Sequence, residues 1–93
     1  MATVINRLKV TGDREKFEEI LSGITAYMKS QPGYLGHELF RSTDGGDTYI
    51  EIARWSDAGA HRKAMEGAGF WERVRELTAH ASAEPGLFEP VGD

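Results

Sequence analysis

Hydrophobic and polar residues alternate along three stretches of the chain, which is the pattern that a half-buried β-strand produces. The alternation predicts strands over residues 3–10, 34–43 and 48–55. Between the last two lies Asp44-Gly45-Gly46-Asp47, and paired glycines tolerate the positive φ angles of a hairpin turn. The second and third strands are therefore predicted to be antiparallel neighbours.

Two other segments carry apolar residues at helical spacing. The first begins after Thr11-Gly12-Asp13, a helix-starting cluster, and ends before Gln31-Pro32-Gly33. The second starts after Ser56-Asp57 and runs from about residue 58 to residue 66, where Gly67-Ala68-Gly69 interrupts it. Its helical stripe then continues with Phe70, Val74 and Leu77.

The order of these elements predicts a fold. A short last strand is expected in residues 86–91, where Pro90 restricts it to an edge or an intermolecular position. Strand, helix, strand, strand, broken helix, strand is the ferredoxin-like α+β arrangement: a four-stranded antiparallel sheet with helices on one face, here as a single domain over residues 1–93. The other face would expose Ile5, Ile50 and Ile52, which predicts a homodimer with sheet facing sheet.

Composition and charge narrow the functional classes. The 93 residues are 40% apolar and 28% charged, typical of a globular domain. The net charge is −4 and the basic residues form no stripe, which argues against a nucleic-acid partner. Cysteine is absent, so thiolate chemistry is excluded, and no apolar run is long enough to span a membrane. A cytoplasmic protein without a membrane partner is expected.

Four segments carry a family resemblance in matching order: TVINRLKV, QPGYLGHELFRS, IARW followed by a helix, and the closing aromatic and proline tail. Over nearly its whole length the chain resembles the antibiotic biosynthesis monooxygenase family. That resemblance implies a dimeric α+β barrel with a pocket between sheet and helices in each subunit. It also implies oxygenation of an aromatic polyketide with dioxygen and without flavin, metal or haem.

Two branches of that family can be compared with the chain. In the cofactor-free branch, which oxidises anthrones and related phenols to quinones, strand three carries an Asn four residues before a Trp. Trp55 matches the Trp, and Glu51 replaces the Asn. In the haem-degrading branch the strand-one Asn matches Asn6. That branch also has a helical Trp and, about ten residues further on, a His that binds the haem. These two do not match, because His61 and Trp71 occur ten apart in the reverse order and Val74 stands near the ligand position.

The chemistry implied by the cofactor-free branch needs an electron-rich aromatic, a dry pocket, a base and donors for an enolate oxygen. Glu51 shares a strand face with Trp55, and burial on that largely apolar face would raise its pKa into a range useful for a general base. The indole N–H of Trp55 and the amide of Asn6 can donate to the oxyanion. A structural alternative for Glu51 is an ion pair with Arg7, Arg41 or Arg54.

The register of the hairpin decides which strand-two residues reach the pocket. A two-residue Gly45-Gly46 loop would place Phe40 opposite Glu51 and bring Glu38 to the pocket face. A slip of one residue would instead bring His37 and Arg41 there, with His37 as the more conventional base and Arg41 as a charge partner for Glu51. The sequence leaves both registers open.

Other candidate substrate contacts come from the helices. Tyr27, Phe70 and Trp71 lie at helical spacing and are core or pocket wall, and His61 is a helix-surface or rim residue. Three functions follow: a cofactor-free monooxygenase of a polycyclic aromatic, a haem-binding or haem-degrading protein, and a non-oxidative protein that binds or cyclises an aromatic polyketide. The first is favoured by the resemblance.

Overall fold

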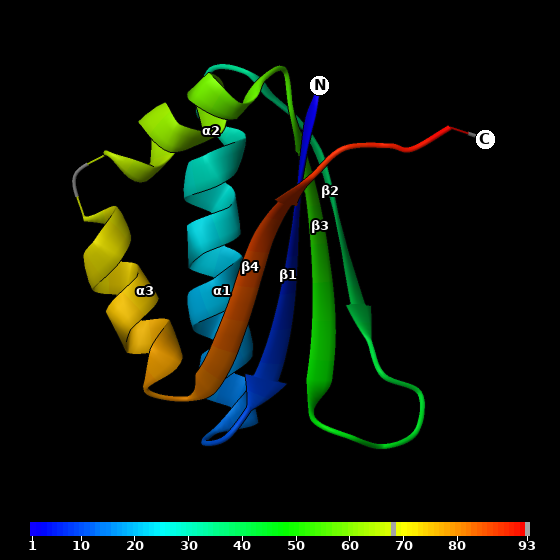
Figure 1. Cartoon of the computed structure of the whole chain (residues 1–93). Coiled ribbons are helices and arrows are strands. Elements are labelled where there is room, and N and C mark those ends of the chain that lie inside the picture. The colour runs from blue at the N-terminus through cyan, green and yellow to red at the C-terminus, as the bar shows by residue number, and fades with distance from the viewer. Residues whose placement is uncertain (68, 93) are drawn as a thin grey trace.

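The sheet and its helices have the order that the sequence predicts. The computed structural model describes residues 1–67 and 69–92. The elements in chain order are β1 (Ala2–Val10), α1 (Arg14–Lys29), β2 (Tyr34–Arg41), β3 (Thr48–Trp55), α2 (Ala58–Met65), α3 (Phe70–Thr78) and β4 (Ala81–Phe88). Strands pair in the order β2-β3-β1-β4, all antiparallel, with the helices on one side (Figure 1). The predicted ferredoxin-like α+β fold is confirmed.

Capping hydrogen bonds and backbone conformation mark where the three helices begin. The Asp13 carboxylate caps α1 by accepting from the Lys16 backbone N–H at 2.9 Å. Asp57 caps α2 in the same way, accepting from the Ala60 N–H at 2.7 Å. Gly69, at φ 81°, precedes α3 in a conformation that glycine adopts without strain. The predicted break at residues 67–69 includes Ala68, which lies outside the described residues.

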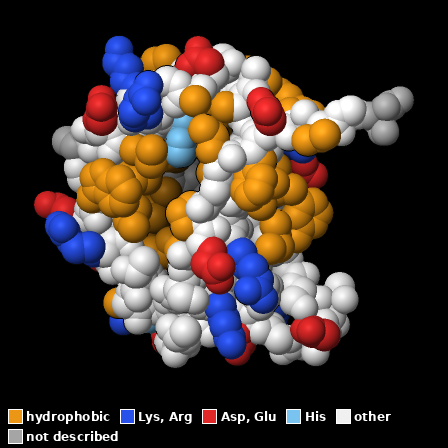
Figure 2. All heavy atoms as spheres, viewed as in Figure 1, with side chains coloured by type: hydrophobic (Ala, Val, Ile, Leu, Met, Phe, Trp, Pro, Cys, Tyr) orange, Lys and Arg blue, Asp and Glu red, His pale blue; other side chains and the backbone are white. Residues whose placement is uncertain are grey.

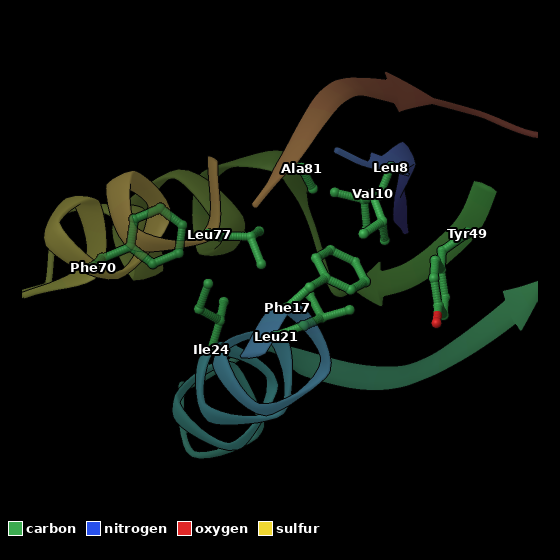
Figure 3. Packing of buried hydrophobic residues seen from close by; sticks show 9 residues of the cluster. All are labelled: Leu8, Val10, Phe17, Leu21, Ile24, Tyr49, Phe70, Leu77 and Ala81. Atoms are coloured by element: carbon green, nitrogen blue, oxygen red, sulfur yellow. The ribbon is translucent and has the colours of Figure 1, made fainter. Parts of the chain in front are cut away.

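The main core lies between α1, α3 and the sheet. Phe17 and Leu21 of α1 point toward Leu8 and Val10 of β1 (Figure 3). Leu8 and Phe17 are fully buried, and full burial of such side chains stabilises a fold by roughly 1.5–3 kcal/mol each. A second, smaller cluster of buried residues surrounds Trp55, and Met28 packs against both clusters.

The last strand differs from the prediction. Instead of a short tail over residues 86–91, β4 begins at Ala81 and pairs with β1 along its whole length. Pro85 argued against a strand here, because proline cannot donate a ladder hydrogen bond. It is tolerated because β4 is an edge strand. Pro90 lies beyond the strand, in the tail that leaves the domain (Figure 1).

The hairpin register also differs from the first of the two sequence alternatives. Leu39, not Phe40, is opposite Glu51, and the loop closes with the Ser42 N–H donating to the Thr48 carbonyl at 2.9 Å. A two-residue loop of the predicted type needs positive φ at both glycines, and only Gly45 has it. The Asp44 carboxylate instead accepts from the Gly46 N–H at 2.8 Å, which favours the longer loop.

Candidate active site

A largely apolar cavity of about 170 Å³ lies between the helices and the sheet. Figure 2 shows hydrophobic side chains gathered around a hollow on this side of the molecule. Its lining comes from every helix and every strand: Val4, Asn6, Leu21, Ile24, Thr25, Met28, Tyr34, His37, Glu51, Ala53, Trp55, His61, Met65, Phe70, Trp71, Val74, Leu77, Ala83 and Pro85. The few polar groups among these residues are therefore exposed to whatever occupies the cavity.

Glu51 and His37 form a carboxyl–imidazole pair in this cavity. The Nε2 atom of His37 lies 3.2 Å from Oε2 of Glu51, and each side chain is only 18% exposed. Burial raises the pKa of Glu51, and the neighbouring His37 opposes that rise. The pair thus holds a carboxylate with elevated basicity against an apolar space, where a general base can take a proton from carbon or phenol.

The register explains how this pair is assembled. His37 pairs with Ala53 on β3, so its side chain leaves the sheet on the same face as Glu51. This is the one-residue slip that the sequence left open. The structural alternative of an arginine partner for Glu51 is wrong, because Arg54 pairs with Glu38 at 2.8 Å and Arg7 with Glu84 at 3.7 Å.

Three residues of the cavity lining each carry a buried polar atom without a hydrogen-bond partner within residues 1–67 and 69–92: Asn6 Oδ1, Tyr34 OH and Trp55 Nε1. A buried polar group left unpaired costs about 1–3 kcal/mol. Native structures keep such groups rarely, and often at functional sites. All three residues line the same cavity, so a ligand that brings both an acceptor oxygen and a hydroxyl donor could pair with the indole N–H, the phenol and the Asn6 carbonyl.

Trp55 anchors one end of the cavity. Its ring is 1% exposed and meets Tyr34 edge-on at 5.4 Å between centroids, and His61 at 5.5 Å. Burial lowers the pKa of His61, which favours its neutral form. Asn6 lies on β1 directly between Glu51 of β3 and Pro85 of β4. Strand pairing therefore brings together residues that the sequence places far apart.

Some of the candidate residues on the helices line the cavity, and one of them instead joins two helices. Phe70 and Trp71 line the cavity in an edge-on pair at 5.1 Å, and Trp71 is 56% exposed. Tyr27 does not line it: its hydroxyl donates to the Ala64 carbonyl at 2.8 Å and ties α1 to α2. Val74 is an apolar part of the lining and offers no atom to a haem iron.

Two predicted contacts from strand two are not in the cavity. Glu38 lies on the opposite face of the sheet, paired with Ile52, because the observed register alternates the other way. Arg41 reaches the helix side but sits opposite Tyr49, two positions beyond Glu51's partner. It lines a second, more open hollow of about 490 Å³ beside α1 and β2, and makes no ion pair with Glu51.

Tyr34 lines the cavity with a polar group, and the sequence did not predict it there. Its place after Pro32-Gly33 suggested only a strand start. The sequence does contain one relevant feature: Tyr34 immediately follows a glycine that takes φ 88°, so the strand can begin with a sharp change of direction. Its partner Trp55 became evident only from the strand pairing.

The described residues contain no group of three or more histidine, aspartate or glutamate side chains arranged to hold a metal ion. Among the same residues, no helix has the length and hydropathy needed to cross a membrane. The fold and the cavity define the class of protein: a ferredoxin-like α+β domain with a pocket between its sheet and its helices, lined mainly by apolar side chains and by a few polar ones.

Comparison with known proteins places the chain within that class. The model of the antibiotic biosynthesis monooxygenase family matches residues 1–72. Deoxynogalonate monooxygenase from Streptomyces nogalater is 36% identical over 86 residues, which cover 92% of this chain and 73% of that protein. The crystal structure of SnoaB, a cofactor-independent oxygenase from Streptomyces nogalater, matches with a TM-score of 0.92 at 34% identity, covering 99% of this chain and 94% of that one.

A conserved protein of unknown function from Bacteroides thetaiotaomicron shares the fold, with a TM-score of 0.83 at 20% identity over 94% of both chains. The chain belongs to the antibiotic biosynthesis monooxygenase family, and it is an oxygenase.

Proposed function

We propose that this protein is a cofactor-independent monooxygenase that oxidises a planar, polyketide-type anthrone or phenol to a quinone or a hydroxylated product. The observation that carries the proposal is the Glu51–His37 pair, 3.2 Å apart at the wall of a largely apolar cavity. The similarity to a cofactor-independent oxygenase at 34% identity supports the same reaction type. The substrates are then a small aromatic and dioxygen.

The chain's part in such a reaction is proton transfer and charge stabilisation. The Glu51 carboxylate takes a proton from the substrate C–H, leaving a carbanion conjugated with the ring ketone. That carbanion gives one electron to dioxygen, and the resulting radical and superoxide join in a C–O bond. The peroxide takes the proton back from Glu51 and loses water, so that anthrone and O₂ give anthraquinone and H₂O.

Other cavity residues act on the charge that develops in this scheme. The N–H of Trp55 is buried and unpaired within the described chain, and it can donate to the enolate oxygen of the substrate. The amide of Asn6, next to Glu51 across the β1–β3 ladder, can hold a second polar edge of the ring. An aromatic substrate that fills this apolar space would displace water from it, and each of these contacts is stronger where water is absent.

The test is oxygen uptake and quinone absorbance with anthrone in air, using protein shown to be free of metal, flavin and haem. We expect a rate above the spontaneous one, and a loss of roughly 100-fold or more in Glu51→Gln, because a positioned base contributes about 10²–10⁴-fold. Trp55→Phe should also slow the reaction. Glu19→Gln, the same change on the exposed side of α1, is the matched control.

Two results would contradict the proposal. Binding of the aromatic without oxygen consumption would indicate a non-oxidative binding or cyclising protein. A defined Soret shift on titration with hemin, lost in His61→Ala, would indicate a haem protein instead. Full activity of Glu51→Gln would leave the oxygenase reaction in place but refute Glu51 as its base.

We also propose that the protein is a homodimer through the open face of the sheet. Ile5, Ile50 and Ile52 lie on that face, and Phe40 and Phe88 are 49% and 52% exposed. Exposed apolar surface of this kind usually marks an interface. Light scattering after size exclusion should give twice the 10.3 kDa chain mass and, for Ile50→Lys, the single-chain mass; a monomeric wild type would contradict the proposal.

A further inference from the structure

Tyr34 is one of the residues that line the cavity, and its buried hydroxyl has no hydrogen-bond partner in the part of the chain that the structure describes. The proposed oxygenation assigns no role to this hydroxyl. A phenylalanine would fill the same space without leaving a polar atom unpaired. The hydroxyl is therefore a feature that packing alone does not explain.

Tyr34 is held in place by the way β2 begins. The Gly33 carbonyl accepts from the Ser56 N–H at 2.8 Å, which joins the start of β2 to the end of β3. A side chain on Gly33 would come within 2.6 Å of the Ala60 Cβ, so the close approach requires glycine. An irregularity between Tyr34 and Gly36 then shifts the register and pairs Tyr34 with Trp55.

The environment keeps this phenol in its donor form. Burial raises the pKa of Tyr34, and the negative charge of Glu51 raises it further. Trp55 Nε1, which can only donate, is buried and unpaired on the neighbouring ring. Two donors thus occur at the end of the cavity formed by β2 and β3, and each lacks an acceptor among the described residues.

We propose that Tyr34 determines substrate specificity by donating its hydroxyl hydrogen, alongside the indole N–H of Trp55, to a carbonyl or phenolate oxygen on the substrate ring. The substrate class is then a fused aromatic ketone or its enolate, with the oxygen directed toward Tyr34 and Trp55 and the acidic C–H toward Glu51. This deepens the proposed function and rests on it for the reaction, but its test needs only binding.

Calorimetric titration with two probes of nearly equal shape separates the oxygen contact from apolar packing. The first probe, 1-tetralone, keeps the aryl ketone of an anthrone, and the second, tetralin, has no oxygen. Wild-type protein should prefer 1-tetralone over tetralin. Tyr34→Phe should lower the affinity for 1-tetralone by roughly 3- to 10-fold, the range expected for one hydrogen bond, and leave the affinity for tetralin unchanged.

Tyr49→Phe is the matched control, because its hydroxyl contacts Arg14 and Glu18 and does not line this cavity. Equal binding of the two probes to wild type, equal weakening of both in Tyr34→Phe, or no binding of either probe would each overturn the proposal. Oxygen uptake is measured separately. Preference for the ketone without oxygen uptake would refute the proposed oxygenase function and still support Tyr34 as the donor to the ligand oxygen.

Discussion

Filling the cavity should stabilise the protein and abolish its activity. Ala53 lines the cavity between Glu51 and Trp55 on β3, and Ala53→Leu would add three carbon atoms to that space. Each buried carbon group contributes about 0.8 kcal/mol, so the gain in free energy of unfolding is at most about 2 kcal/mol. In a domain of this size, 1 kcal/mol moves Tm by about 4–8 °C.

Catalysis should fall by roughly 100-fold, because even a 1 Å displacement of a bound substrate can cost that factor. Opposite changes in stability and rate are expected where a space is kept open for a ligand. Thermal unfolding by circular dichroism and oxygen uptake with anthrone measure the two effects. Ala26→Leu makes the same change at an exposed position of α1, and should alter neither Tm nor rate appreciably.

The sign of the stability change distinguishes a vacant cavity from a well-packed core around Ala53. If the cavity were a well-packed core, the added carbons would force strain and destabilise the fold by about 1–3 kcal/mol. A destabilised Ala53→Leu would therefore refute a vacant ligand space. A stabilised variant with wild-type activity would show that the substrate binds elsewhere.

Three further predictions concern the Glu51–His37 pair and the contact between Gly67 and Tyr27. His37→Leu removes the group that opposes the raised pKa of Glu51, so the acidic limb of the pH profile of kcat/KM should move to higher pH. The control His80→Gln should leave the limb in place. An unmoved limb in His37→Leu would show that His37 does not influence the pKa of the catalytic base. The raised pKa means that ionised Glu51 destabilises the fold, so Glu51→Gln should unfold at higher urea than wild type at pH 8, and this advantage should disappear as the pH falls below the ordinary value of 4.5. A constant advantage would contradict burial as its cause. Gly67→Ala would place a Cβ against the Tyr27 hydroxyl and should lower the free energy of unfolding by about 1–3 kcal/mol, with part of that loss recovered in the double variant with Tyr27→Leu; additive effects in urea titrations would argue against the contact.

The helices and three of the strands follow from the sequence by itself. The periods of the apolar residues and the caps at Asp13 and Asp57 are local properties, and short-range sterics and hydrogen bonds decide them. The face shared by Glu51 and Trp55 is equally local, since alternation along one strand requires only the backbone pleat. The family resemblance drew on the same local segments.

The partners of those residues were decided by tertiary structure. Whether His37 or Glu38 meets Glu51 depends on a one-residue difference in register, and the loop geometry at Gly45 decides it together with packing of the whole sheet. The strand containing Pro85 is stabilised by pairing with β1, against its own local preference.

The cavity itself is the least local feature of the protein. Asn6, Tyr34 and Trp55 come from three different strands, and nothing in their spacing along the sequence indicates that these three residues, each with a buried unpaired polar atom, line one cavity. The sequence thus determined the elements and the candidate base, because these depend on near neighbours along the chain. Only the folded sheet decided which side chains surround that base, because such contacts join residues distant in sequence.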